Sequence, residues 1–404
     1  MRVKAVVALI LAGALLIAAP VSAGIFDKTG QSGVTFLNIS PSAASAGMGD
    51  ASTSLSTGAD AAFYNPGGLG FLRGTADARI GYVKWFADIN VSSGAVAVPI
   101  PIGGNPAFVA ALSYVTMDYG DIYGTVINTD SSNSLHEVGL ISPTETAIGL
   151  TVAKQFTDKF SVGVTAKLVS QTLPWYNTNG LTGGLTVIPE DASLSIVTFD
   201  AGTMYRTGFG SSVISMSIRN FGRTQTYEID GFRPPVTFRI GASMDVLDLT
   251  PAIQENGHGL ILACEGIHPP DHPEKVVVGL QYSFLDMIYL RGGAEFTTNT
   301  RWSSNSDRIY LDDKGDDIDD TVDYLFQVNA PRILQELPLI TRMDDPILDL
   351  NYRDDKRDPD TRSMSLGIGL KYEIGGVRSG FDFAYTDFGN ALGSVNYFTL
   401  SFGM

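Results

Sequence analysis

Near its start the chain carries the stretch Phe36-Leu37-Asn38-Ile39-Ser40-Pro41-Ser42-Ala43-Ala44-Ser45-Ala46-Gly47-Met48-Gly49-Asp50-Ala51, then a Ser/Thr/Ala/Gly run, then Asp60-Ala61-Ala62-Phe63-Tyr64-Asn65-Pro66-Gly67-Gly68-Leu69-Gly70. So many small residues with so few charges cannot form an amphipathic helix, because no polar face would meet water. Gly and Pro set tight turns, and small side chains let a backbone pass close to surrounding walls. Two interpretations remain open: an enclosed plug with short helical turns, or a Gly/Ala-rich surface loop.

Most of the remaining chain shows a two-residue period. From Lys275 to Phe284 and again from Ser363 to Tyr372, apolar residues alternate with polar or small ones, and charges keep to one face. This is the pattern of a strand with one apolar and one polar face. Such runs begin near Ala76, Asn90, Ala107, Thr146, Lys159, Leu194, Ser211, Pro235, Gly259, Pro273, Asp286, Ser363, Val377 and Gly393. They predict about fourteen strands, many of them long enough to cross an outer membrane at a tilt.

The connections between these runs sort by length. Alternate connections are short, as at Thr157-Asp158 and Ile374 to Gly376, while the others include Asp118 to Pro143, Gln171 to Ala192 and the far longer 297–362. This asymmetry is typical of outer-membrane barrels, which have short periplasmic turns and longer outer loops. The sequence therefore predicts an all-β fold, a transmembrane antiparallel β-barrel of about fourteen strands, with a soluble sandwich or propeller as the alternative.

The first residues predict export. Arg2 and Lys4 precede an apolar run from Ala5 to Ala19, and Val21-Ser22-Ala23 supplies small residues for a peptidase, so 1–23 is interpreted as a signal peptide. A single-span anchor is the alternative, but the run is shorter than the ~20 residues that a helical span requires. A net charge of −16 argues against nucleic-acid binding, which requires basic patches.

Two segments resemble a known family. Ser40-Pro41-Ser42-Ala43 leading to Gly47-Met48-Gly49, and Ala62-Phe63-Tyr64-Asn65-Pro66, resemble the N-terminal hatch of the PorV/PorQ family, which belongs with the FadL-type outer-membrane barrels; Gly67 stands where that family commonly has Ala. The resemblance implies that 24–75 is a hatch inside a barrel formed by 76–404. The hatch residues that it points to are Asn38, Ser40, Pro41, Gly47, Met48, Gly49, Asn65 and Pro66. The closing file Phe398, Leu400, Phe402 and Met404 resembles a C-terminal assembly signal, which usually ends in Phe.

The third predicted strand is apolar on both faces. One face carries Phe108, Ala110, Leu112 and Tyr114, and the other carries Val109, Ala111, Val115 and Met117. One face would meet lipid, and the second would either pack against the plug or line an apolar pocket. Polar alternate positions, Lys167, Arg219, Arg239, Lys275, Arg291, Glu295, Lys371 and Asp382, are predicted to face the lumen, as paired structural charges or as a conduction path.

No catalytic or metal motif accompanies these features, so we expect neither an enzyme nor a cofactor. The four histidines fall in predicted loops or at a strand start, and His268-Pro-Pro-Asp271-His272 matches no known metal-site spacing. Cys264, the single cysteine, lies in an apolar run and is interpreted as a packed residue. The acidic run from Asp312 to Asp323 lacks the spacing of a Ca²⁺ loop, so a hydrated segment is favoured over a Ca²⁺ site.

Two functions remain. The resemblance implies a protein of the bacterial outer membrane, embedded in its lipid, that acts in secretion and surface attachment of the type IX kind by binding secreted cargo proteins and a translocon. Leu348, Leu350 and Tyr352 in the longest loop are candidate docking residues. The alternative is a FadL-like transporter for long-chain fatty acids or other hydrophobic small molecules, with its pocket between the hatch and the first three strands.

Overall fold

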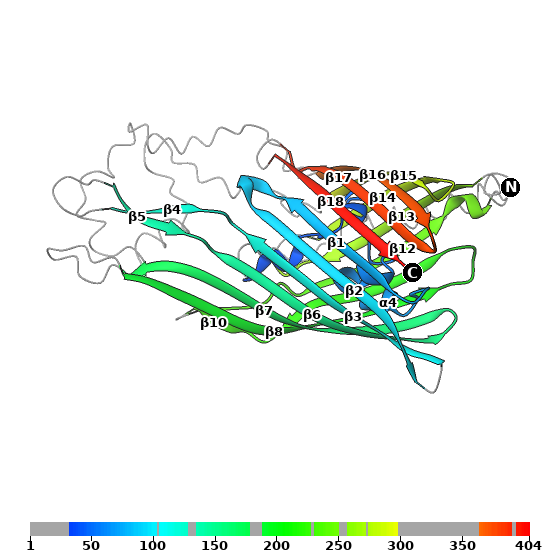
Figure 1. Ribbon diagram of the computed structural model, residues 1–404, viewed down its shortest axis with the longest axis horizontal. Helices are drawn as coiled ribbons and strands as arrows, with labels where there is room; N and C mark the ends of the chain where they lie inside the picture. Colours follow the sequence, from blue (N-terminus) through cyan, green and yellow to red (C-terminus); the bar gives the residue numbers. More distant parts are fainter. Residues whose placement is uncertain are drawn as a thin grey trace, which may run out of the picture. The chain divides into compact units, whose positions relative to one another are not determined.

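Fourteen antiparallel strands close into a barrel in the computed structural model (Figure 1). The structure describes residues 32–102, 105–127, 135–177, 188–227, 230–249, 257–271, 274–297, 363–389 and 393–404. The signal-peptide prediction, most of the longest loop and the candidate docking residues Leu348, Leu350 and Tyr352 lie outside these ranges. No helix within these ranges is long and apolar enough to cross a membrane.

The barrel strands follow one another along the chain, and the last pairs with the first. They are β1 (Asp77–Lys84), β2 (Asn90–Ile102), β3 (Asn105–Asp118), β6 (Thr144–Thr157), β7 (Phe160–Asn177), β8 (Ile188–Arg206), β9 (Val213–Gly222), β12 (Thr237–Asp245), β13 (His258–His268), β14 (Lys275–Phe284), β15 (Ile288–Thr297), β16 (Ser363–Ile374), β17 (Val377–Asp387) and β18 (Ser394–Gly403). Closure leaves no unpaired edge, since Asp77 faces Gly403 and Lys84 faces Asn396 across the β1–β18 ladder. The prediction of a fourteen-stranded antiparallel barrel is confirmed.

The connections differ from the sequence-based expectation at the end with the long loops. The stretch from Asp118 to Pro143 contains a hairpin of β4 (Ile122–Ile127) and β5 (Leu135–Ile141), and β10 (Gln225–Tyr227) pairs with β11 (Asp230–Phe232) in the next such connection. The predicted loop from Gln171 to Ala192 was too long, because β7 and β8 continue their ladder to Asn177 and Ile188. Local pattern marks where membrane strands are, but not how far pairing extends beyond them.

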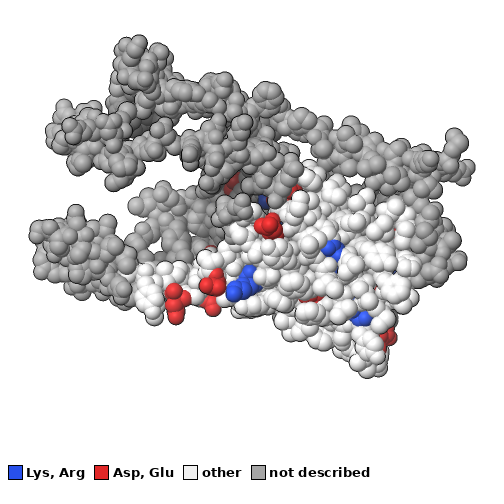
Figure 2. Space-filling view, turned by 90° about the horizontal axis from the view of Figure 1, so that it is seen from above, with Lys and Arg blue, Asp and Glu red and all other residues white. Residues whose placement is uncertain are grey.

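The outer surface of the barrel is apolar at alternate positions. Leu112, Val164, Leu366 and Leu370 are all more than half exposed, whereas the residues beside them in sequence face inward. The face shown in Figure 2 carries few charged side chains over the described strands. Exposing so many apolar side chains to water would cost free energy, whereas exposing them to lipid does not. This barrel therefore spans the bacterial outer membrane.

Residues 32–75, which we call the inner segment, lie inside the barrel wall (Figure 1). Its short helical turns are η1 (Thr35–Asn38), α2 (Ala43–Ala46), η2 (Gly58–Asp60), α3 (Ala61–Tyr64) and α4 (Pro66–Leu69); η3 (Phe86–Asp88) and η4 (Val246–Leu249) lie between barrel strands. α2 contacts β16, β17 and β18, while α4 contacts β6, β7 and β8. Since these two strand groups lie on different parts of the closed ring, the inner segment crosses the lumen.

Candidate functional site

The inner segment is held against the wall by hydrogen bonds from its Asn-Pro turn. Asn65 is fully buried; its Nδ2 donates to the carbonyl oxygens of Thr53 at 2.9 Å and of Thr203 on β8 at 3.1 Å, and its Oδ1 accepts from Gly67 N at 3.0 Å. The last bond caps α4, and Pro66 occupies the first helical position, where a missing N–H costs nothing. One side chain therefore shapes the turn and attaches it to the barrel.

Glycines on both sides allow this close approach. A Cβ at Gly67 would lie 2.8 Å from Thr203 Cα, which real Cβ atoms essentially never show. The paired wall glycines Gly163 and Gly202 leave the recess that the Asn65-Pro66 turn fills. Gly67 therefore departs from the resembled family's Ala for a steric reason that the sequence alone does not show.

The Gly47-Met48-Gly49 turn of the predicted hatch also approaches the wall closely at glycines, on the opposite side of the barrel. Gly47 lies against Gly367 of β16, and Gly49, with a left-handed φ of 67°, lies against the backbone at Gly293 of β15. Met48 between them is buried in a small cluster with Ala263 and Val277. At both turns the wall carries glycine where the backbone of the inner segment comes closest, as close packing requires.

Buried ion pairs join the inner segment to the lumen-facing side chains. Arg239 Nη2 lies 2.8 Å from Asp50 Oδ2, and its Nη1 lies 3.1 Å from Glu265 Oε1. Glu265 also accepts from the backbone N of Thr53 at 2.9 Å. Asp60 of the inner segment forms an ion pair with Arg79 of β1. These contacts satisfy charges that burial would otherwise penalise.

The remaining charges that the sequence assigned to the lumen divide into two groups. Lys167 pairs with Asp200 at 2.8 Å, Lys275 with Glu295 at 2.8 Å and Arg291 with Asp382 at 2.6 Å, so the prediction of paired structural charges is confirmed for them. Arg219 and Lys371 form no ion pair with any residue in the described ranges. Both nevertheless face the lumen as predicted.

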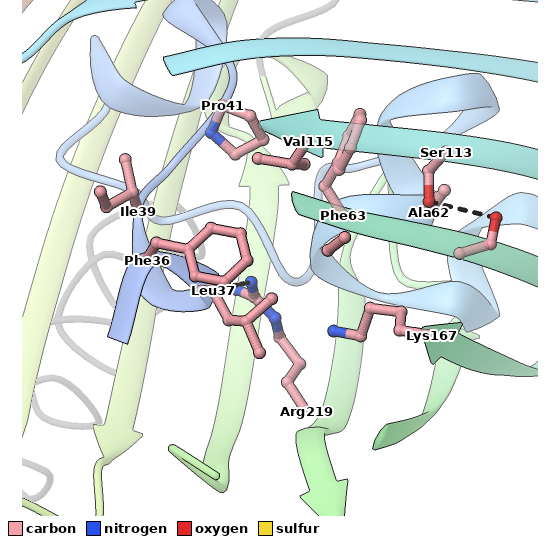
Figure 3. A pocket seen from close by; sticks show the side chains of 12 residues that line it. Phe36, Leu37, Ile39, Pro41, Ala62, Phe63, Ser113, Val115, Lys167 and Arg219 are labelled. Atoms are coloured by element: carbon pink, nitrogen blue, oxygen red, sulfur yellow. Dashed lines mark hydrogen bonds between the residues drawn. The ribbon is translucent and has the colours of Figure 1, made fainter. Parts of the chain in front are cut away.

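The cavity nearest the predicted pocket lies between the inner segment and β3, β6, β7 and β9 (Figure 3). Its lining is Phe36, Leu37, Ile39, Pro41, Ala62, Phe63, Ser113, Val115, Ala147, Gly149, Lys167 and Arg219. Its free volume is about 30 Å³, which is room for one or two water molecules and not for an organic ligand. The lining is thus mostly apolar, with two cations at one side.

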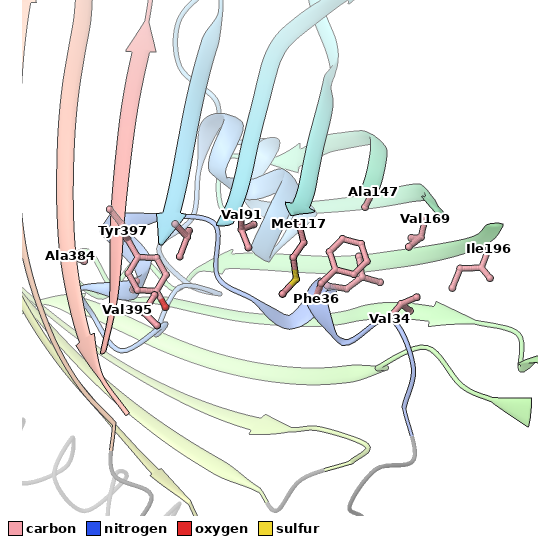
Figure 4. Close-up of a cluster of buried hydrophobic side chains, with 14 residues drawn as sticks. Val34, Phe36, Val91, Met117, Ala147, Val169, Ile196, Ala384, Val395 and Tyr397 are labelled. Carbon is pink, nitrogen blue, oxygen red and sulfur yellow. The ribbon is translucent and has the colours of Figure 1, made fainter. Parts of the chain in front are cut away.

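Of the four third-strand residues that the sequence assigned to a pocket or a plug contact, only Val115 lines this cavity. Val109 and Ala111 pack against the apolar residues of η2, α3 and α4, and Met117 packs with Phe36 and Val169 in the cluster shown in Figure 4. The inward face of the third strand therefore mainly packs against the inner segment, and it lines the cavity at Val115 alone among these four residues.

Arg219 stands out in this cavity. Its Nη2 donates to the carbonyl oxygen of Leu37 at 3.1 Å, its guanidinium carbon lies 5.8 Å from the centre of the Tyr64 ring, and its buried Nε has no hydrogen-bond partner. The Tyr64 hydroxyl lies 2.5 Å from Ser40 Oγ and accepts from Ser42 N, and burial raises its pKa, so it stays neutral. Arg219 is the buried cation of this cavity with hydrogen-bonding capacity to spare.

The last predicted hatch residue, Asn38, contacts an irregularity in the wall. The β8–β9 register shifts between Phe199 and Ala201, and Asn220 takes a φ of 59°. Asn220 N donates to Asp200 Oδ1 at 2.7 Å, and Asn220 Nδ2 donates to Asn38 Oδ1 at 3.2 Å. The side chains replace backbone pairing that the irregularity removes.

No group of three or more potential metal ligands occurs in the described part of the chain. His268 Nδ1 lies 3.1 Å from Glu274 Oε1, while His272 falls outside that part, as does the acidic run from Asp312 to Asp323. Cys264 is partly exposed on β13.

Sequence reasoning missed Arg73, Arg206 and Arg378, which line a second cavity with Lys371. For Arg206 and Arg378 the available signal was an inward-facing place in the strand alternation beside a short turn; Arg73 lies before the first strand and carried no such signal.

Comparisons with solved structures match nearly the whole chain. The toluene transporter TbuX of Ralstonia pickettii has a TM-score of 0.51 at 10% identity, covering 90% of this chain and 97% of that chain. The toluene transporter TodX of Pseudomonas putida has a TM-score of 0.50 at 10% identity, covering 89% and 96%. A Pseudomonas aeruginosa FadL homologue has a TM-score of 0.46 at 12% identity, covering 89% and 97%.

No protein-family model matches the chain, and no match was found among curated proteins. At such low identity the structural matches establish the fold and nothing finer. The chain shares the fold of the FadL-like outer-membrane barrels.

Proposed function

We propose that this barrel transports hydrophobic small molecules across the outer membrane. The observation that carries the proposal is the cavity between the inner segment and β3, β6, β7 and β9, whose lining is mostly apolar yet includes Arg219 of β9. Ligand sites are typically apolar with a few placed polar groups, and this cavity has that composition. Arg79 and Arg239 also keep a buried Nε without a hydrogen-bond partner, but each is paired with a carboxylate. Arg219 forms no ion pair within the described ranges, so a ligand carboxylate would supply the counter-charge that this cation lacks.

The small size of the cavity implies movement. About 30 Å³ cannot admit an organic molecule, so the inner segment must shift before a ligand enters. Phe36, Leu37 and Phe63 would move with it, because all three belong to the inner segment. Transport in this proposal is therefore coupled to displacement of the inner segment from the wall.

Arg219 suggests which hydrophobic molecules fit best. A carboxylate reaching the cavity would meet the Nε group that has no partner, and hydrogen bonds between ionised groups are the stronger ones. A long-chain fatty acid combines that carboxylate with an apolar body. The neighbours TbuX and TodX are described as toluene transporters, which supports apolar small molecules by analogy of fold.

The secretion hypothesis stays a prediction. Its candidate docking residues, Leu348, Leu350 and Tyr352, lie outside the described residues, and nothing in the described wall favours a protein partner over a small molecule. The comparisons support transport better than they support cargo or translocon binding.

The experiment pairs two readouts in a deletion strain complemented with variants: initial uptake of a labelled long-chain fatty acid, and display of surface proteins. Val115→Trp should fill the cavity and reduce uptake, while Leu112→Trp, on the lipid face of the same strand, should leave it unchanged. Both should leave display normal. Lost display with normal uptake in the deletion strain would favour the secretion hypothesis instead.

A further inference from the structure

A second, larger cavity opens among the strand ends that are joined by short turns. It has a free volume of about 300 Å³ and is lined by residues of β1, β8, β16, β17 and β18 together with residues 57–58 and 71–73 of the inner segment. Arg206 ends β8, Arg378 follows the short turn after β16, and Asp77 begins β1. Short turns face the periplasm in outer-membrane barrels, so this cavity is a vestibule on the periplasmic side.

The vestibule carries an unbalanced charge. Four cations, Arg73, Arg206, Lys371 and Arg378, line it with one carboxylate, Asp77. Asp77 Oδ1 already accepts from Ala59 N at 2.7 Å. Glu373 stands opposite Arg378 in the β16–β17 ladder but forms no ion pair with it.

None of the four cations forms an ion pair or a side-chain hydrogen bond with another residue in the described ranges. The contrast with the rest of the lumen is informative, because Arg79, Lys167, Arg239, Lys275 and Arg291 are each paired with a carboxylate. Four like charges around one concavity repel one another and attract anions. Arg219 is the exception among these other lumen cations, but it stands alone, whereas four unpaired cations around one cavity indicate a binding site and not a structural network.

The vestibule also presents apolar surface. The guanidinium carbon of Arg206 lies 3.9 Å from the centre of the Phe71 ring, and Leu72 lines the cavity beside it. Stacking on an aromatic face orients the guanidinium while leaving its edge N–H groups available to a carboxylate. A volume of about 300 Å³ lies at the small end of ligand pockets.

We propose that this vestibule binds a small organic carboxylate, with the carboxylate between Arg206 and Arg378 and the apolar body against Phe71 and Leu72. The site is separate from the cavity lined by Val115 and Arg219, and it does not depend on the transport function. Free phosphate or an acidic peptide offers negative charge without the apolar body, and both are outcomes of the test.

The test uses the purified full-length protein in a non-ionic detergent, with 3-phenylpropionate as probe and calorimetry as readout. Binding should occur with 3-phenylpropionate and be lost with the uncharged 3-phenylpropanol. Arg206→Gln and Arg378→Gln should each weaken binding about tenfold, which corresponds to about 1.4 kcal/mol, since each removes one charged hydrogen-bond partner of the carboxylate. Arg223→Gln, an exposed arginine outside the vestibule, should change the Kd less than about twofold.

A second measurement is independent of ligand affinity. In a Cys264→Ser background, Ser401→Cys places a thiol on the vestibule wall. An anionic methanethiosulfonate should react with it faster than a cationic one of the same size, and Arg206→Gln should reduce that ratio. Equal rates for both reagents, unchanged 3-phenylpropionate binding in both Gln variants, or binding of phosphate or a polyglutamate peptide without 3-phenylpropionate would each overturn the proposal.

Discussion

Asn65 Nδ2 donates to the backbone oxygen of Thr203, so a single side chain of the inner segment supplements a barrel strand 138 positions later in the chain. The same amide donates to Thr53 O, and no water is needed to satisfy it. The inner segment is thereby attached to the wall at the turn that the sequence singled out.

Asn65→Ala should loosen the inner segment without opening the barrel. The change leaves buried acceptors at Thr53 and Thr203 without their donor, which should cost about 2 kcal/mol in the opening free energy of this segment. Hydrogen exchange of amides in residues 36–70 measures that free energy. Asn90→Ala is the control, because the exposed amide of Asn90 bonds only outside the inner segment, donating to Asp88 O and accepting from the Tyr82 hydroxyl. Equal effects of both changes would refute the role given to Asn65.

Gly67→Ala should be harmful although the resembled family commonly has Ala there. The added Cβ would lie 2.8 Å from Thr203 Cα, and overpacking of this kind costs ~1–3 kcal/mol. Protease resistance of residues 32–75 in the folded barrel reports the loss. At Gly94 an added Cβ would meet its nearest atom at 3.7 Å, so Gly94→Ala should leave resistance at the wild-type level.

Asp50→Asn should weaken the second attachment of the inner segment. It removes the charge that faces Arg239 at 2.8 Å and should cost ~1.5–3 kcal/mol, since hydrogen bonds to charged groups are worth that much. Asp88→Asn is closely matched: Asp88 also has a left-handed φ, but its pair with Lys84 is exposed and 3.7 Å apart. Hydrogen exchange of amides 45–56 should accelerate for Asp50→Asn and stay at the wild-type rate for Asp88→Asn.

The cost of an arginine on the lipid-facing side of the barrel should depend on its depth in the membrane. Ile368 lies in the middle of β16 and Ile374 at its end, both on the lipid-facing side. An arginine near the bilayer midplane costs ~2–4 kcal/mol and one near the interface ~0–1 kcal/mol. Ile368→Arg should therefore lower the folded fraction on unheated gels, whereas Ile374→Arg should not, and the reverse order would mean that β16 is placed at the wrong depth.

Strand number and facing could be predicted because they depend on a local period. Residues such as Leu366 and Ile368 alternate with small or polar neighbours, and each lies outside the barrel as the pattern requires. The partners of lumen charges could not be predicted in this way. Arg239 meets Asp50, and Lys167 meets Asp200, only because closure of the barrel brings distant segments together.

The vestibule shows the same limit more strongly. Arg73, Arg206, Lys371 and Arg378 are scattered through the sequence and belong to different elements, so no motif joins them. The pairing of β7 with β8 beyond Gln171 was missed for a related reason, because pairing beyond the membrane depends on the partner strand and not on lipid-facing alternation.

Transport by displacement of the inner segment can be tested by locking that segment to the wall. Ser243 Oγ of β12 lies 3.5 Å from the backbone oxygen of Ser54, so these two residues are neighbours across the boundary between segment and barrel. Ser54→Cys with Ser243→Cys, in a Cys264→Ser background, is the pair to cross-link, and disulfide formation is first verified by the loss of free thiols. The measurement is the initial uptake rate of a labelled long-chain fatty acid by the deletion strain carrying this variant, before and after a mild reductant. The account predicts uptake at the deletion level when oxidised and at the wild-type level when reduced. Uptake that is equally fast in both states, or undiminished in the deletion strain itself, would contradict it.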